Sequence, residues 1–184
     1  MGDVQATLDE RTIAFIRRQR LFFVATAPAG GNGHVNCSPK GLDTLRVLGP
    51  STVAYLDFVG SGAETIAHLR ENGRIVIMFC AFDGPPGIVR LHGRGDVVEP
   101  GDEGFESLIA SFDPHPGVRA IIRLETTRVS HSCGFGVPLM RYEGERTQLT
   151  GWAQRKGPEG LAAYQRSHNL TSIDGLPALR QDGG

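Results

Sequence analysis

Short apolar runs separated by glycine-rich turns predict that most of this chain forms β-strands. The run at 21–27 is followed by a glycine loop and a returning segment at 34–40, which is the pattern of a hairpin. The run at 74–82 is apolar at nearly every position, as in a central strand covered on both faces. Further strands are expected at 44–48, 51–58, 88–99 and 118–135. Gly93 and Gly95 predict a bulge or a close backbone approach within the strand at 88–99.

Helical signals fill the gaps between these strands. Helices are expected over about 9–19, 63–71 and 102–112. Thr7 and Glu10 have the spacing of a capping box at the start of the first. From about residue 143 the chain becomes more polar and predicts one or two helices, interrupted at Gly157.

These elements predict a mainly β (α+β) fold. The economical arrangement is a closed antiparallel barrel of about six strands, with short flanking helices and a C-terminal helical segment. A single domain is expected over residues 1–184. Its parts would be an N-terminal helix (about 1–20), the barrel (about 21–142), the helical segment (about 143–177) and a loose tail (178–184). Pro39 lacks an N–H donor, so its strand is expected at or near a sheet edge.

Composition narrows the classes of partner. Hydrophobic residues make up 40% and charged residues 21% of 184, enough to bury a core. Lysine and arginine number 19 against 20 acidic residues, so neither nucleic acid nor an acidic membrane surface is an expected partner. Because no apolar run is long enough to span a membrane and the first residues are polar, a cytoplasmic location is expected. Cys37, Cys80 and Cys133 lie too far apart to suggest a zinc site, so no metal is expected, and Cys80 is expected in the core.

One constellation could carry chemistry. Alternation places Asn36, Ser38 and Lys40 on one face of their strand, opposite Val35 and Cys37. The simplest alternative is that this polar face is only solvated.

The segment GSGAET at 60–65 offers a second feature, a small-residue loop running into a helix. Such a helix start presents unpaired N–H groups and a positive dipole end, to which Ser61 and Thr65 can add hydroxyls. Together with the ammonium of Lys40 this predicts a phosphate-sized anion site, although many such loops hold no ligand. No hydrolase elbow or metal-binding motif accompanies it.

Several strings together resemble a known family: FFVATA, VNCSPKG, YLDFVGSGAETIAHLRENGRIVIMF and RLHGRGDV, followed by SCGFGVP and SIDGLP. In this order they are similar to the pyridoxamine 5′-phosphate oxidase-like flavin-binding split barrels, specifically to an uncharacterised subgroup. The resemblance implies a six-stranded split β-barrel and a homodimer with flavin mononucleotide (FMN) in two grooves at the dimer interface. It implies cofactor contacts at Asn36, Ser38, Pro39, Lys40, Tyr55, Ser61, Gly62 and Thr65. It leaves Trp152 or Arg141 of the partner subunit as candidates to close the site.

Departures from the family pattern limit what the resemblance implies. The oxidases carry a serine-arginine-lysine run where this chain has Ser61, Gly62 and Ala63, and a glutamine where it has Ile88. The implied function is therefore an FMN-dependent oxidoreductase acting on an unknown small-molecule substrate or electron donor, without pyridoxamine phosphate oxidation. The alternative is a non-catalytic flavin- or haem-binding carrier on the same fold. A deazaflavin in place of FMN also stays open, and no catalytic residue is assigned.

Overall fold

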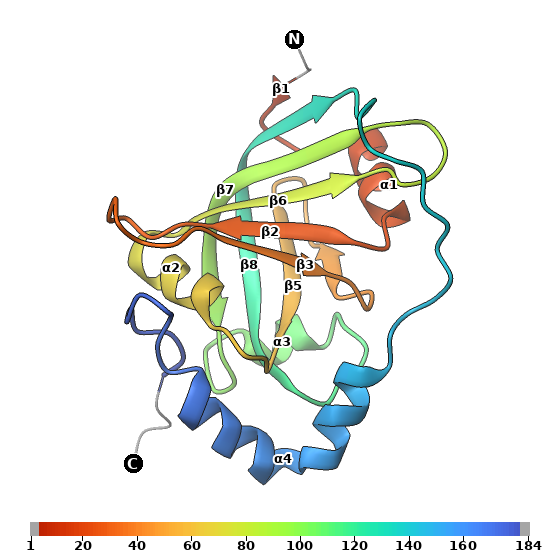
Figure 1. Ribbon diagram of the computed structural model, residues 1–184. Coiled ribbons are helices and arrows are strands. Elements are labelled where there is room, and N and C mark those ends of the chain that lie inside the picture. The colour runs from red at the N-terminus through yellow and green to blue at the C-terminus, as the bar shows by residue number, and fades with distance from the viewer. Residues whose placement is uncertain (1–3, 181–184) are drawn as a thin grey trace.

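The computed structural model describes residues 4–180, which form one curled antiparallel sheet with four helices (Figure 1). The strands are β1 (Val4–Gln5), β2 (Phe22–Thr26), β3 (Asn36–Lys40), β4 (Leu45–Val47), β5 (Thr52–Phe58), β6 (Arg74–Cys80), β7 (Ile88–Val98) and β8 (Val118–Ser132). The helices are α1 (Glu10–Arg18), α2 (Glu64–Asn72), α3 (Phe105–Ile109) and α4 (Gln148–His168). The strand order is β3-β2-β6-β7-β8-β5-β4, with β1 paired to β8.

The sheet is a split barrel, which confirms the predicted fold class. It is open rather than closed, because the strand path ends at β3 on one side and β4 on the other. The turn between these strands carries Leu42 (φ 61°) and Asp43 (φ 51°) in the left-handed region. β3, which contains Pro39, lies at the edge as predicted. The described residues form eight strands rather than about six, partly because the two-residue β1 leaves no recognisable pattern in the sequence.

The core fills the inside of the curl, and α2 closes one end of it. Inward side chains of β2, β6 and β7 alternate with half-buried or exposed outward ones, as the pleat requires. Ile66, Ala67 and Leu69 of α2 are buried in the same cluster as Val24, Ile77 and Leu91 of the sheet. In Figure 1 α2 lies beneath the left-hand ends of β2 and β3. This packing brings the first turn of α2 to the inner face of β3.

Three local predictions need correction. Asp9, not Thr7, caps α1: its carboxylate accepts a hydrogen bond from the Thr12 N–H at 2.7 Å. α3 is a five-residue helix, much shorter than the expected 102–112. Ala178 and Leu179 are buried, so the tail expected to be loose is docked at its start, whereas 181–184 lie outside the described residues.

Other expectations are confirmed. β7 and β8 shift register between His92 and Gly93, which is the expected bulge. α4 is interrupted at Gly157, whose φ of 64° and ψ of 174° are not helical. Within residues 4–180, none of the helices has the length and apolar character that a bilayer crossing requires.

The bulge at Gly93 yields a stability prediction. A Cβ at this position would overlap the backbone oxygen of Glu125 on β8, and neither strand can yield without breaking the ladder. We expect Gly93→Ala to lower the free energy of unfolding by about 2 kcal/mol or more, the cost typical of overpacking. Gly49→Ala is the control, because nothing lies within 4 Å of its Cβ position. Urea denaturation of both variants tests this; equal small losses would contradict it.

Candidate functional site

A polar cluster lines the inner face of β3. Asn36, Ser38 and Lys40 are half-buried there, whereas Cys37 and Pro39 on the other face are exposed. The predicted division of the strand into two faces is confirmed. The polar face is the inner one, so it is not simply a solvated exterior.

Hydrogen bonds tie this face to the first turn of α2. The Asn36 amide donates to the hydroxyl of Thr65 at 2.9 Å and to that of Thr26 at 3.2 Å, and Ser38 donates to the Asn36 carbonyl oxygen at 3.0 Å. The Nδ1 atom of His68 lies 2.9 Å from the Thr26 hydroxyl. Burial lowers the pKa of His68, so its ring is neutral near pH 7. Residues 36 and 65, predicted from separate motifs, are therefore direct partners.

A buried ion cluster lies beside these hydrogen bonds. Lys40 donates to one oxygen of Asp57 at 3.0 Å, and the Nε of Arg119 donates to the other at 2.7 Å. The Asp57 side chain is 1% exposed and that of Arg119 is 5% exposed. Burial alone would raise the pKa of Asp57, but the two cations hold it below its ordinary value. Two positive charges and one negative charge leave the cluster with a net charge of +1.

Arg119 is the site residue that the sequence analysis missed. Its Nη2 donates to the carbonyl oxygen of Gly62 at 2.8 Å, so it reaches the 60–65 loop from the start of β8. The loop lacks the arginine and lysine that the family oxidases carry, and Arg119 supplies a guanidinium at the same place from another strand. A signal was present, because Arg119 is the one charge within the apolar run 118–122.

Several donors around the loop remain available for a ligand. The N-cap residue of α2, Ala63, makes no side-chain capping bond. Glu64 turns toward the C-terminal segment, where it accepts a hydrogen bond from the Ile173 N–H at 3.3 Å. The Nη1 atom of Arg119 is buried and has no partner within residues 4–180. Lys40 has three N–H donors and gives one to Asp57. These donors fit an anionic group such as a phosphate.

The other predicted site residues fall at different depths. Tyr55 is fully buried, with its ring 5.5 Å from that of Phe22 and the Lys40 ammonium 5.9 Å away on its other contact. Burial, with the charge of Asp57, raises the pKa of Tyr55 well above its ordinary value, so the phenol stays protonated. Ser61 is exposed and Gly62 is half-buried in the loop.

Three residues named in the sequence analysis lie away from the cluster. Pro39 faces outward from β3. Trp152 packs edge-on against Tyr164 of α4 at 5.2 Å, and Arg141 is exposed and pairs with Glu143 at 3.0 Å. The structure therefore does not bring these three together with the residues of β3, β5, α2 and β8.

Comparisons with known proteins give a consistent result. A family model described as pyridoxamine 5′-phosphate oxidase matches residues 8–133. The pyridoxamine 5′-phosphate oxidase family protein ustO of Aspergillus flavus is 44% identical over 179 residues, covering 88% of this chain and 72% of that protein.

Solved structures share the fold at low identity. HupZ of Group A Streptococcus has a TM-score of 0.54 at 21% identity, over 68% of this chain and 99% of that one. A putative pyridoxamine 5′-phosphate oxidase of Lactobacillus delbrueckii has a TM-score of 0.51 at 20% identity, over 68% and 98%. An FAD binding protein of Mycobacterium smegmatis also has a TM-score of 0.51, at 14% identity, over 68% and 96%.

Proposed function

The chain belongs to the pyridoxamine 5′-phosphate oxidase family, and from this premise we propose that it is an oxidoreductase that binds FMN. The observation that carries the proposal is the net positive cluster of Lys40, Asp57 and Arg119 beside an uncapped helix start. A phosphate monoester suits this place, because it takes both positive charge and backbone N–H donors. The FAD binding protein with the same fold supports a flavin as the phosphate-bearing group.

The residues of the cluster would have distinct tasks in holding the cofactor. Lys40 and Arg119 would bind the phosphate, and Asp57 would hold both cations in place. Asn36 and Ser38 would fix the position of Thr65, whose hydroxyl lies at the helix start. A bound flavin would supply the capacity to accept and return a hydride or electrons.

The cluster favours orientation and electrostatics over proton transfer. The pKa of Asp57 is lowered and that of Tyr55 is raised, so neither exchanges a proton near neutral pH. The pKa of His68 is also lowered, and its ring lies among buried groups. This observation equally favours a second candidate, a flavin carrier without catalysis, so the test must separate binding from turnover.

A second copy of this chain is the partner that we propose. The outer faces of β2 and β6 carry a row of half-buried apolar side chains, Phe23, Ala25, Val76 and Met78, paired across the two strands. No helix of residues 4–180 shares the core clusters with these four residues. An uncovered apolar sheet face of this kind is typical of an interface.

The test is a spectrum followed by a reduction experiment. The purified protein, incubated with FMN and desalted, should keep flavin absorption bands, and sedimentation should give the mass of two chains. Bleaching by NADH or NADPH with recovery in air would support an oxidoreductase, whereas bound flavin inert to every donor class tried would favour the carrier. A colourless protein without quenching of flavin fluorescence, or one with a haem Soret band, would overturn the proposal.

A further inference from the structure

A separate cavity lies at the other side of the barrel wall from the polar cluster. It encloses about 250 Å³ between the end of α1, the β3–β4 turn, β4 and the segment before α4. This volume is slightly below the ~300–1,000 Å³ usual for ligand pockets, so a ligand of amino-acid size fits. Neither Asn36, Ser38 nor Lys40 lines it. The ring of Phe22 lines the cavity and packs against Tyr55, which lies beneath Lys40.

The floor of the cavity is apolar. Ile16, Phe22 and Phe79 contribute buried side chains, and Leu45 and Val47 of β4 add half-buried ones. The two phenylalanine rings lie 5.9 Å apart and offer a flat aromatic surface. A ligand that takes this surface would have an apolar, preferably aromatic, body.

The rim of the cavity is charged, and part of that charge is uncommitted. Arg46 is engaged with Asp43, Asp113 and the carbonyl oxygen of Ser111. Arg17 and Arg20, one helical turn apart, form no ion pair with any residue in the described part of the chain. Two free guanidinium groups above an apolar floor are suited to a carboxylate attached to an apolar body.

The segment 142–145 forms one wall of the cavity. Glu145 accepts hydrogen bonds from the Tyr142 hydroxyl at 2.8 Å and from the Leu42 N–H at 3.3 Å, and the Arg20 guanidinium lies 5.3 Å from the Tyr142 ring centre. Figure 1 shows this stretch of chain descending along the right edge of the molecule toward α4. Glu145 adds one negative charge opposite the two arginines, so the free charges of the rim sum to +1. That sum suits a monocarboxylate better than a phosphate dianion.

The backbone at the rim is also strained. Leu42 and Asp43 both adopt positive φ, at 61° and 51°, and a branched residue such as leucine rarely takes this conformation. Strain of this kind concentrates at ligand-binding sites. We propose that this cavity binds a small aromatic monocarboxylate, with its ring on Phe22 and Phe79 and its carboxylate on Arg17 and Arg20.

The test uses phenylacetate as the probe and amide chemical shifts of ¹⁵N-labelled protein as the readout. We expect saturable shifts in the cavity-lining segments, about tenfold weaker binding of the neutral phenylacetamide, and no saturation by acetate. The expected loss corresponds to one charge-assisted hydrogen bond to a charged group. The double variant Arg17→Gln/Arg20→Gln should weaken phenylacetate binding about tenfold or more. Arg18→Gln, from the same exposed helix but facing Phe15, should leave binding unchanged.

The outcomes separate this inference from the proposed function. Titrations are run with and without saturating FMN, whose own spectrum reports the cofactor site. Phenylacetate shifts confined to the cavity in a protein that binds no flavin would uphold the cavity and overturn the flavin proposal. Shifts at Asn36 and Thr65 alone, equal affinity for the amide, or unchanged affinity in the double variant would overturn the cavity site.

Discussion

Asp57→Asn is expected to lower the free energy of unfolding by about 3–5 kcal/mol at pH 7. The substitution keeps the shape of the side chain but removes the charge that balances Lys40 and Arg119. Breaking a buried ion pair costs this much because it leaves a cation desolvated and uncompensated. Against a total stability of about 5–15 kcal/mol, such a loss would lower the melting temperature by about 10 °C.

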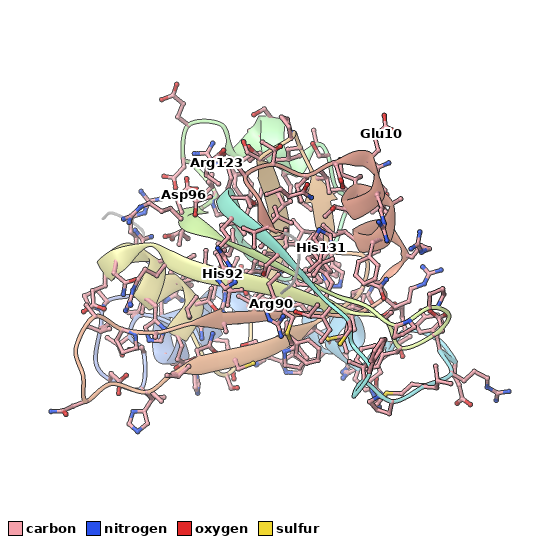
Figure 2. All side chains as sticks on the ribbon, turned by 90° about the horizontal axis from the view of Figure 1, so that it is seen from above. Glu10, Arg90, His92, Asp96, Arg123 and His131 are labelled. Atoms are coloured by element: carbon pink, nitrogen blue, oxygen red, sulfur yellow. The ribbon has the colours of Figure 1, made fainter. Side chains whose placement is uncertain are left out.

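An exposed ion pair on the same sheet provides the matched control. Asp96 of β7 and Arg123 of β8 pair at 2.8 Å and lie side by side at the surface, each about half exposed (Figure 2). Solvent screens such a pair, so Asp96→Asn should cost no more than about 1 kcal/mol. Guanidinium denaturation of both variants measures the two losses. A loss for Asp57→Asn as small as that of the control would mean that the buried cluster contributes no more than a surface pair.

The pH dependence of this effect has a definite sign. The folded-state pKa of Asp57 is depressed, so its contribution is fully present above its unfolded value of about 3.9. The contribution is lost as pH falls through the lower folded-state pKa. The stability difference between the wild type and Asp57→Asn should therefore stay constant from pH 7 to 5 and shrink below about pH 4. A difference that grows on acidification would contradict the assignment of the charge to Asp57.

Much of the fold was accessible from the sequence because its signals are local. The apolar run at 74–82 became the central strand β6, and Gly93 marked a real bulge. The openness of the barrel was not accessible, since it depends on whether β3 and β4 meet across the Leu42–Asp43 turn. The cap of α1 was misassigned because Thr7 and Asp9 both have capping side chains, and only the backbone entering the helix decides between them.

The candidate site was half accessible for the same reason. Period-two alternation placed Asn36, Ser38 and Lys40 on one face, and the loop before α2 was marked by its small residues. Arg119 lies more than 50 positions from that loop, so only tertiary structure reveals that it donates to Gly62. A lone charge within an apolar run is a signal for a buried ion pair, and it does not identify the partner.

Lys40→Met is expected to weaken FMN binding about 10–100-fold while leaving riboflavin binding nearly unchanged. The reason is that Lys40 would contact the phosphate, which riboflavin lacks, and a hydrogen bond to a charged group contributes about 1.5–3 kcal/mol. The change also removes one cation from Asp57, so some stability is lost. Comparing two ligands on one folded protein separates that loss from the ligand contact.

The chain's other lysine supplies the control for this prediction. Lys156 lies on α4 over the rings of Trp152 and Tyr164, away from β3 and the first turn of α2. Lys156→Met should bind both ligands as the wild type does, measured by quenching of flavin fluorescence at fixed salt. The ratio of FMN to riboflavin affinity is the decisive quantity. A ratio that Lys40→Met leaves unchanged would place the phosphate elsewhere, whereas a ratio reduced toward one would assign it to the cluster of Lys40, Asp57 and Arg119.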